Sequence, residues 1–434
     1  MNCPMPNNNL LNVCLNRDGQ VSRRRLLQVA GGGFAGLGGL PFLQRLGLAA
    51  DEARRNGRAC IVVFLNGAPS QFETWNPKPG TENGGPTQVI DTAIPGVPFA
   101  EYWPKLAAMM NDVSVIRTMA GKEAAHDRGT YHLLTGRRLG GASRFPHFGS
   151  VVSHELGDPD AEIPNFISIG DTLNAGFLGV RFSPFVVPRA GELPANVEAT
   201  VAETRVDRRL SLLADQDADF QTAGAERIAA EHQELYRKAA RLMTSEHLKA
   251  FTVEGESDAV KSQYGRHEFG QGCLIARRLV ESGVPFVQVR RSGWDMHANL
   301  WQNIPRAAGE VDEGVSALLT DLKQRGMLEK TLVVVLGEFG RTPKINQSTP
   351  NVGRDHFARN FNLLMAGGGI KGGVCVGTTS SDGMEIDDRP VEVDDFFHTM
   401  CRCMGIDADK ELITPEGRPL RIVDAGAPVE ELLS

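Results

Sequence analysis

The stretch Thr331-Leu-Val-Val-Val-Leu336, followed by Gly337-Glu-Phe-Gly-Arg-Thr-Pro343, decides the fold class of this chain. A short run of apolar and β-branched residues without alternation is typical of a parallel strand that is buried on both faces. Glu338 comes directly after this run, and open α/β sheets place their ligand sites at the carboxyl ends of parallel strands. The stretch therefore predicts a central strand with a functional carboxylate at its end.

A second apolar strand, predicted over residues 285–290, runs into Gly293-Trp-Asp-Met-His297. Asp295 and His297 are two positions apart, so their side chains point the same way if this segment is extended. Carboxylate and imidazole groups are common protein ligands of divalent cations such as zinc. The pair predicts a metal-dependent site, and the alternative is the start of a helix with a surface histidine.

Strand and helix patterns alternate along the rest of the chain. Further strands are predicted over residues 59–65, 113–117, 164–169, 361–366 and 374–377, and helices over residues 102–110, 128–134, 148–155, 225–251, 268–282, 304–325 and 393–404. This order predicts a single α/β domain over residues 58–434, built on a doubly wound, mostly parallel sheet with helices on both faces. Residues 171–225, rich in Pro, Ala and charge, are expected to form an insertion over the sheet.

The first fifty residues are expected to be an export signal. Ser22-Arg-Arg-Arg-Leu-Leu27 precedes an uncharged, glycine-rich stretch, and small residues up to Ala50 suit cleavage. This resembles a twin-arginine signal and predicts a protein of the periplasm or the outside of the cell. A membrane anchor and a buried helix are the alternatives. No later segment is apolar for long enough to span a bilayer, so no membrane span is expected in the mature chain.

Charge and cysteine spacing narrow the function classes. The chain carries 46 Lys and Arg residues against 53 Asp and Glu residues, a formal net charge of −7. This balance argues against nucleic acid as a partner, because nucleic-acid-binding proteins present a basic face. The seven cysteines form no Cys-x-x-Cys motif, so neither a zinc ribbon nor a redox motif is expected.

Several motifs occur in an order that resembles one protein family. They are Pro69-Ser-Gln71, Gly293-Trp-Asp-Met-His297, Gly337-Glu-Phe-Gly-Arg-Thr-Pro343, Gly353-Arg-Asp-His356, Ala366-Gly-Gly-Gly-Ile-Lys-Gly-Gly373 and Gly417-Arg-Pro419. Together with the leader, they resemble the exported family called domain of unknown function 1501, over essentially all of residues 58–434. That family is related to the alkaline phosphatase and sulfatase superfamily. The resemblance implies an alkaline-phosphatase-like fold and a metal-dependent hydrolase ancestry.

The resemblance also implies a metal centre above the carboxyl edge of the sheet. Asp295 and His297 match the superfamily's first carboxylate–histidine pair, and His356, with Asp355 beside it, matches its late histidine. Asn66 stands where the first strand normally ends in a metal-binding Asp. An amide oxygen can bind a cation but contributes no charge, so a second metal would be held more weakly. The cation is expected to be zinc, calcium, manganese or magnesium, and the sequence does not choose between them.

The chain departs from the superfamily pattern at the position of the nucleophile. The segment that begins at His126 resembles the nucleophile helix of sulfatases, yet the nucleophile position holds this histidine and not a Ser, Thr or Cys. Its imidazole could attack phosphorus, bind the metal or act as a general base. Glu338 keeps a carboxylate of the superfamily, while Phe339 replaces the histidine that normally follows. Glu338 is expected to bind metal or transfer a proton, unless it forms a salt bridge with a nearby arginine.

Two arginines are expected to offset charge on the transferred group. Arg341 and Arg354 could each clamp an oxyanion through two parallel hydrogen bonds. Structural pairing with Glu338 or Asp355 is the alternative. The three contiguous glycines from Gly367 do not form a dinucleotide-binding fingerprint. They are expected to let the backbone approach the site closely, or simply to make a turn.

These residues leave two functions open. The first is an exported, metal-dependent hydrolase-like protein that acts on phosphate or sulfate esters of a small molecule or a polysaccharide. The second is a non-catalytic exported binding or scaffold protein that has kept a cation on the same fold and lost the nucleophile. The carboxylate–histidine set favours the enzyme, whereas Asn66 and His126 favour the second function. The sequence fixes neither the substrate nor the oligomeric state.

Overall fold

The fold is described from a computed structural model. The structure describes residues 57–434 apart from 142, 194–196, 198–204, 206–207, 210, 214, 218–225 and 349–350. The predicted export signal, residues 1–50, therefore lies outside the described residues.

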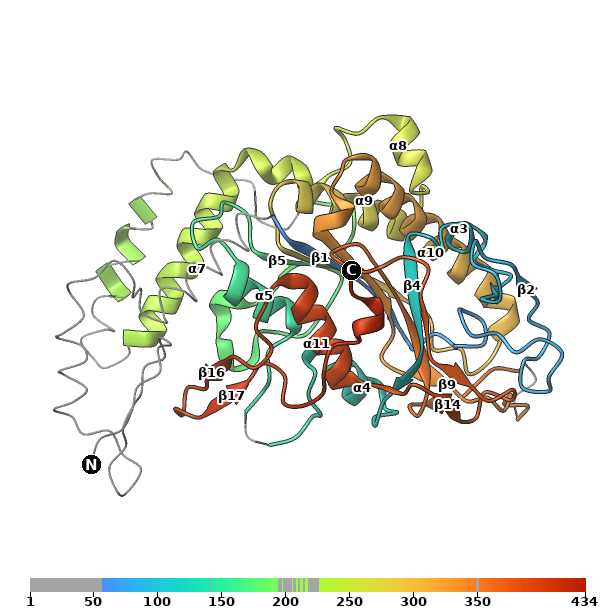
Figure 1. Cartoon of the computed structure of the whole chain (residues 1–434). Coiled ribbons are helices and arrows are strands. Elements are labelled where there is room, and N and C mark those ends of the chain that lie inside the picture. Colours follow the sequence, from blue (N-terminus) through green and yellow to red (C-terminus); the bar gives the residue numbers. More distant parts are fainter. Residues whose placement is uncertain are drawn as a thin grey trace, which may run out of the picture. The chain divides into compact units, whose positions relative to one another are not determined.

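A central sheet runs through the domain (Figure 1). Among the described residues it has nine strands, in the order β12-β4-β11-β8-β1-β7-β5-β6, and β15 pairs with β4. Its strands are β1 (Ala59–Asn66), β4 (Val113–Ala120), β5 (Phe166–Ile169), β6 (Phe185–Val187), β7 (Phe286–Ser292), β8 (Thr331–Leu336), β11 (Phe361–Ala366), β12 (Cys375–Val376) and β15 (Val391–Glu392). Only β11 is antiparallel to its neighbours among the described strands of this sheet. The predicted mostly parallel α/β sheet is confirmed.

The central strands are buried on both faces, which explains their unbroken apolar sequences. Side chains of a strand alternate between the two faces of the sheet. On β1, Ile61 and Val63 join the hydrophobic core on one face, whereas Val62 and Phe64 join the core on the other. Strand β8 pairs with β1 in register and alternates in the same way.

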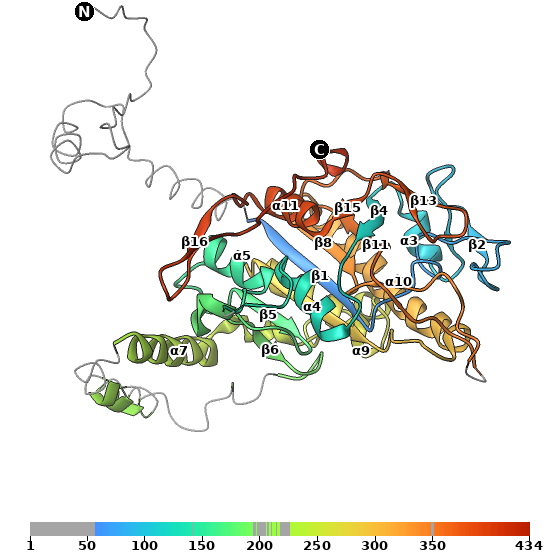
Figure 2. The same cartoon turned by 90° about the horizontal axis from the view of Figure 1, so that it is seen from below.

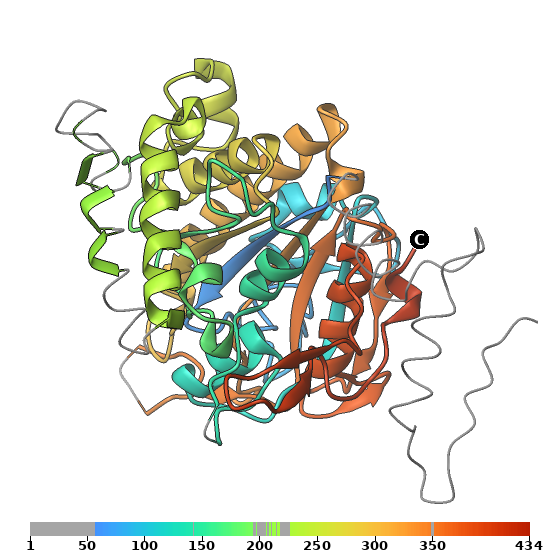
Figure 3. The ribbon, with the colours of Figure 1, turned by 90° about the vertical axis from the view of Figure 1, so that its left-hand side faces the viewer.

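Helices cover both faces of the sheet, as predicted (Figures 2 and 3). The first face carries α3 (Pro104–Ala108), α9 (Glu268–Glu281) and α10 (Leu300–Gln324), and the second carries α4 (His126–Thr135), α5 (Phe148–Leu156) and α11 (Val393–Met404). The described residues also include the helices α7 (Glu226–Thr244) and α8 (Asp258–Gln263). Four two-stranded ribbons are formed by β2 (Val89–Ile90) with β3 (Phe99–Ala100), β9 (Gly340–Arg341) with β10 (His356–Phe357), β13 (Thr378–Thr379) with β14 (Ile386–Asp388), and β16 (Glu411–Ile413) with β17 (Pro419–Arg421).

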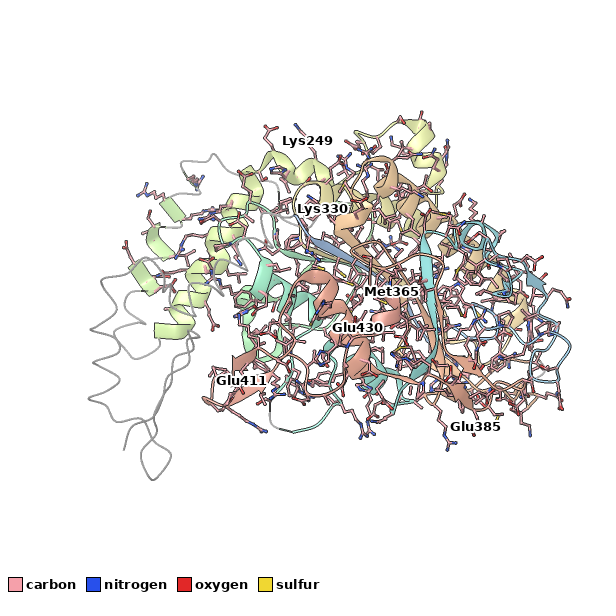
Figure 4. The ribbon with its side chains drawn as sticks, in the orientation of Figure 1. Lys249, Lys330, Met365, Glu385, Glu411 and Glu430 are labelled. Carbon is pink, nitrogen blue, oxygen red and sulfur yellow. The ribbon has the colours of Figure 1, made fainter. Side chains whose placement is uncertain are left out.

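Side chains divide between interior and surface as this layering requires. Met365 of β11 is fully buried, whereas Lys249, Glu385 and Glu411 lie on the outside of the domain (Figure 4). Within the described residues, no helix combines the length and the apolar character needed to cross a bilayer.

Two expectations are corrected by the topology. Part of the segment 171–225 is not an insertion over the sheet, because β6 pairs with β5 and extends the sheet's edge. The glycines from Gly367 follow an antiparallel strand and so lie at the sheet edge opposite the carboxyl ends of β1, β7 and β8. They form a turn with positive φ, and a Cβ on Gly368 would lie 2.8 Å from the Leu332 backbone. Their close approach is to β8 and not to the predicted site.

A buried carboxylate ties α5 to the C-terminal part of the chain. Glu155 lies 2.8 Å from Nδ1 of His154 and accepts a hydrogen bond from Nζ of Lys410 at 2.6 Å. Burial by itself raises the pKa of Glu155, but the hydrogen bonds from these two side chains outweigh it, so the pKa is lowered. Glu155 therefore stabilises the fold in its charged form.

Candidate metal centre

The predicted site residues come from four loops at one edge of the sheet. His126 begins α4, in the connection that follows β4, whereas Asp295 and His297 follow β7 and Glu338 follows β8. These three strands are parallel, so their carboxyl ends share an edge. His356 lies on β10, which precedes the antiparallel strand β11 and so reaches the same edge.

Three histidines surround one oxygen atom of Asp295. The Nε2 atoms of His126, His297 and His356 lie 3.3, 3.0 and 3.4 Å from Asp295 Oδ1. The Nε2 atoms of His297 and His356 are 3.0 Å apart. Ligand atoms of His126, Asp295 and His356 all lie within 4.8 Å of one another. The structure thus brings together four predicted residues from three separate parts of the chain.

The other ring nitrogen of each histidine is held by an acceptor. Nδ1 lies 2.7 Å from Glu338 Oε1 in His126, 2.8 Å from Asp355 Oδ1 in His297, and 2.7 Å from the carbonyl oxygen of Ala124 in His356. An ionised carboxylate or a carbonyl only accepts hydrogen bonds, so each Nδ1 carries a proton, and a ring in its neutral form then presents an unprotonated Nε2 to Asp295. Histidines that bind metals are commonly held in this way by carboxylates and carbonyls.

The donor set fits a divalent cation. Ligands bound to zinc at about 2.0–2.2 Å in a tetrahedron are about 3.3–3.6 Å from one another. The observed separations of 3.0–3.4 Å are close to this spacing. Nε2 of His126 is also buried and has no hydrogen-bond partner among the described residues. In the neutral form the Nε2 atoms would repel one another and the carboxylate, and a bound cation would remove this repulsion.

Arg341 fixes the charged state of Asp295. One of its terminal nitrogens donates to Asp295 Oδ1 at 2.6 Å. The same nitrogen also donates to the carbonyl oxygen of Gly67, and Nε of the buried guanidinium donates to that of Ala68. Burial by itself raises the pKa of Asp295, but the hydrogen bond from Arg341 and its charge outweigh it, and the pKa is lowered to about 2. Arg341, which was predicted to bind an oxyanion, instead donates its hydrogen bonds to the carboxylate of Asp295 and to the backbone.

Glu338 holds His126 and the loop after β1. Its carboxylate is 1% exposed, and Oε1 is close to His126 Nδ1 and accepts from the backbone N–H of Gly67 at 2.8 Å. Neither Arg341 nor Arg354 is its hydrogen-bond partner, so the alternative of a salt bridge with a nearby arginine is wrong, and Glu338 forms a carboxylate–histidine pair instead. The hydrogen bond to Glu338 raises the pKa of His126. Glu338 acts on the cluster through His126.

Arg354 has a structural partner instead of the expected oxyanion. Arg354 and Glu73 are both 0% exposed, and Nε and one terminal nitrogen of Arg354 donate to the Glu73 carboxylate at 3.1 and 2.9 Å. The remaining N–H groups donate to the carbonyl oxygens of Thr342, Pro343 and Asn83. A guanidinium has five N–H donors, and all five are used here. This geometry corrects the expectation of a catalytic Arg354.

Two predicted metal ligands take other positions. Asp355 contacts His297 Nδ1 and accepts two hydrogen bonds from the Asn346 amide, so it positions His297. The hydrogen bond to His297 lowers the pKa of Asp355. Asn66 ends β1 opposite Ser292 of β7, and no described contact joins its carboxamide to the histidines. The structure therefore places both at the edge of the cluster.

Backbone groups that no side-chain motif could reveal complete the site. The Ala124 carbonyl group orients His356, and Gly67 lets the loop after β1 approach β7 closely. A Cβ on Gly67 would lie 2.4 Å from the backbone nitrogen of Asp295, and its φ is 110°. Only glycine adopts that conformation without strain. The one sequence signal for this contact is the glycine itself.

Comparison with known proteins finds one matching family and several solved structures of low sequence identity. The family described as "Protein of unknown function (DUF1501)" matches residues 57–433, and no curated protein matches the chain. Among solved structures, PsFucS1 sulfatase from Pseudoalteromonas sp. is 13% identical, with a TM-score of 0.38 and coverage of 83% of this chain and 72% of that one. Phosphonate monoester hydrolase of Agrobacterium radiobacter is 12% identical, with a TM-score of 0.40 and coverage of 86% and 77%. An alkaline phosphatase superfamily protein from Vibrio parahaemolyticus is 11% identical, with a TM-score of 0.39 and coverage of 83% and 75%.

Proposed function

The chain belongs to the DUF1501 family, and we propose that it is a metal-dependent hydrolase of phosphate or sulfate esters. The observation that carries the proposal is the convergence of three histidine Nε2 atoms on Asp295 Oδ1. The leader sequence supports export by the twin-arginine route to the periplasm or beyond the cell as part of the same proposal.

Asp295, His297 and His356 would hold one divalent cation, and the side chains around them set its ligands in advance. Arg341 keeps Asp295 ionised, while Asp355 and the Ala124 carbonyl group turn the two imidazoles. A cation bound there would supply Lewis-acid polarisation of an ester oxygen. Asp295 and His297 have side chains that are 46% and 41% exposed, so an ester can reach the cluster from solvent.

His126 would act first as the general base and then as the general acid. Its Nδ1 is occupied by Glu338, so Nε2 is the nitrogen that faces the cluster. In the proposed reaction a water molecule attacks phosphorus or sulfur and passes a proton to Nε2. The bond to the ester oxygen breaks, and the imidazolium returns the proton to the departing alcohol. Glu338 stabilises the intervening imidazolium, because its carboxylate contacts Nδ1.

One observation favours the non-catalytic alternative. No hydroxyl or thiol side chain makes a described contact with the side chains of the cluster, so a Ser, Thr or Cys nucleophile is missing from the site as described. If Nε2 of His126 also bound the cation, four protein ligands would fill a tetrahedral shell. Filled shells are typical of structural metals, whereas catalytic sites keep an open position.

Metal analysis followed by hydrolysis assays tests the proposal. We expect purified protein to bind one divalent cation per chain and to hydrolyse an aryl phosphate or aryl sulfate, with loss of turnover in chelator. His297→Ala should remove the cation, whereas His247→Ala, an exposed histidine on another segment, should leave it. His126→Gln should keep the cation and lose turnover. Bound cation without turnover on either ester would favour the scaffold function, and a wild-type protein that binds no divalent cation would refute both.

A further inference from the structure

A crevice lies beside the metal centre at the same edge of the sheet. It has a volume of about 660 Å³, and it is lined in part by Gly170 and Asp171, which follow β5, and by residues 290–292 at the end of β7. We call it the β5–β7 crevice. Ser292 lines it, and Asp295 of the metal centre is three residues further along the chain. Three residues span at most about 11 Å, so the two sites are adjacent.

The crevice lies where the chain connections change direction. Residues after β5, such as Phe177, pack against the core on the second face of the sheet. Residues after β7, such as Ile304 of α10, pack into the core on the first face. Connections that leave neighbouring strands towards opposite faces open a gap between their carboxyl ends. In open α/β sheets this is a position where ligands bind.

Arginines outnumber carboxylates by four to three in the charged lining of the crevice. Arg189, Arg290, Arg291 and Arg306 line it, together with Asp171, Glu268 and Glu310. Glu310 alone accepts hydrogen bonds from both Arg291 and Arg306. Asp171 has a side chain that is 88% exposed and lies 3.9 Å from Arg290, and Glu268 is also exposed. The more buried part of the lining therefore holds more guanidinium than carboxylate groups.

Two buried nitrogens in the lining have no hydrogen-bond acceptor among the described residues. One is Nε of Arg290 and the other is Nε2 of His267. His267 accepts the backbone N–H of Gly270 at Nδ1, so a neutral ring carries its proton on Nε2. The oxygen of Glu313 is 3.4 Å from Nε2 but completes no hydrogen bond. A buried donor without an acceptor costs about 1–3 kcal/mol, so either side chain would gain by turning this nitrogen towards an acceptor in the crevice.

We propose that the β5–β7 crevice binds an oxyanion, namely a second sulfate, phosphate or carboxylate group of an extended substrate. Arg290 and His267 each have a donor nitrogen without an acceptor that can turn towards the anion, and Arg306 and Arg189 supply charge at the opening. Anion binding here stands by itself, whereas the identification of the anion as part of the substrate rests on the proposed function. The substrate class is then a polyanionic ester, with one charged group at the metal centre and another in the crevice.

Titration calorimetry with inorganic sulfate and inorganic phosphate, at constant ionic strength, tests anion binding without turnover. Arg290→Gln should weaken binding at least tenfold, and Arg290→Lys, which keeps the charge but removes Nε, should lie between the two. Arg421→Gln, an exposed arginine on β17, is the control and should have no effect. Arg306→Gln changes a side chain that is 84% exposed, so it should fold normally, and it should weaken binding several-fold.

A comparison with the metal centre separates the two proposals. Sulfate binding that survives His297→Ala but is lost in Arg290→Gln supports the crevice, even if no ester is hydrolysed. Binding that is lost in His297→Ala and unchanged in Arg290→Gln and Arg306→Gln overturns the crevice and leaves the hydrolase proposal standing. For an active enzyme, an aryl ester with a second sulfate should have a lower KM than the monoester, and Arg290→Gln should abolish that advantage with little change in kcat.

Discussion

Replacing Glu73 by Gln tests whether Arg354 is a structural or a catalytic residue. The two side chains are fully buried, and Glu73 accepts two of the five N–H groups of Arg354. The substitution removes the negative charge and leaves the guanidinium charged in the interior. Breaking a buried ion pair by removing one partner costs about 3–5 kcal/mol, because the remaining charge is uncompensated. That is a large part of the roughly 5–15 kcal/mol by which a domain is stable.

The cost should be reduced when both partners are removed. Arg354→Met alone leaves the Glu73 carboxylate buried without its partner, so it should also be strongly destabilising. The double variant leaves neither charge, and its cost should fall below the sum of the single costs by about 2–3 kcal/mol, the upper part of the range for contacting residues. Three carbonyl groups that Arg354 now satisfies remain without a donor, so the double variant should stay less stable than the wild type.

Urea unfolding of the wild type, both single variants and the double variant measures these free energies. Folded Glu73→Gln protein should bind the cation as the wild type does, because the pair does not touch the histidine cluster. Lys249→Gln, an exposed surface change, is a matched control for loss of one charge. A cost below about 1 kcal/mol for Glu73→Gln, or additive costs in the double variant, would refute the reasoning. So would loss of the cation at full stability.

Three further predictions follow from the same contacts. Asp355→Asn should weaken cation binding about 10–100-fold, because the carboxylate that accepts from Nδ1 of His297 and orients the ring is lost. A competition titration with a chelating dye measures this affinity, and an unchanged affinity would contradict the prediction. Gly129→Ala should lower the melting temperature, because its Cβ would lie 2.7 Å from the ring of Phe339. This clash should outweigh the helix propensity of alanine, which is more favourable than that of glycine by about 1 kcal/mol. A higher melting temperature would contradict the packing. The lowered pKa of Glu155 means that its contribution to stability is present above its unfolded pKa and is lost as the pH falls through the folded pKa. The free energies of unfolding of the wild type and of Glu155→Gln should therefore differ most near neutral pH and converge in acid. A difference in urea midpoint that stays constant with pH would contradict this.

The strands show how much of the fold the sequence carries. The predicted bounds of β8 and β11 are those of the structure, because an unbroken run of buried residues marks a central strand. The antiparallel direction of β11 was not predicted. An apolar run is the same whichever way the strand points, so direction depends on the path of the connecting chain. That direction places His356 at the site and the glycines from Gly367 at the opposite edge.

The candidate site divides in the same way. The sequence by itself determined which residues carry carboxylate and imidazole groups suited to a cation, because Asp295, His297 and His356 stand at recognisable strand ends and motifs. Only the tertiary structure decided the partners: Arg341 holds Asp295, Glu338 holds a histidine, and Arg354 is paired inside the domain with a carboxylate 281 positions away. The physical reason is that a side chain's chemistry is local, whereas its hydrogen-bond partner is set by which distant segments the fold brings within about 3 Å.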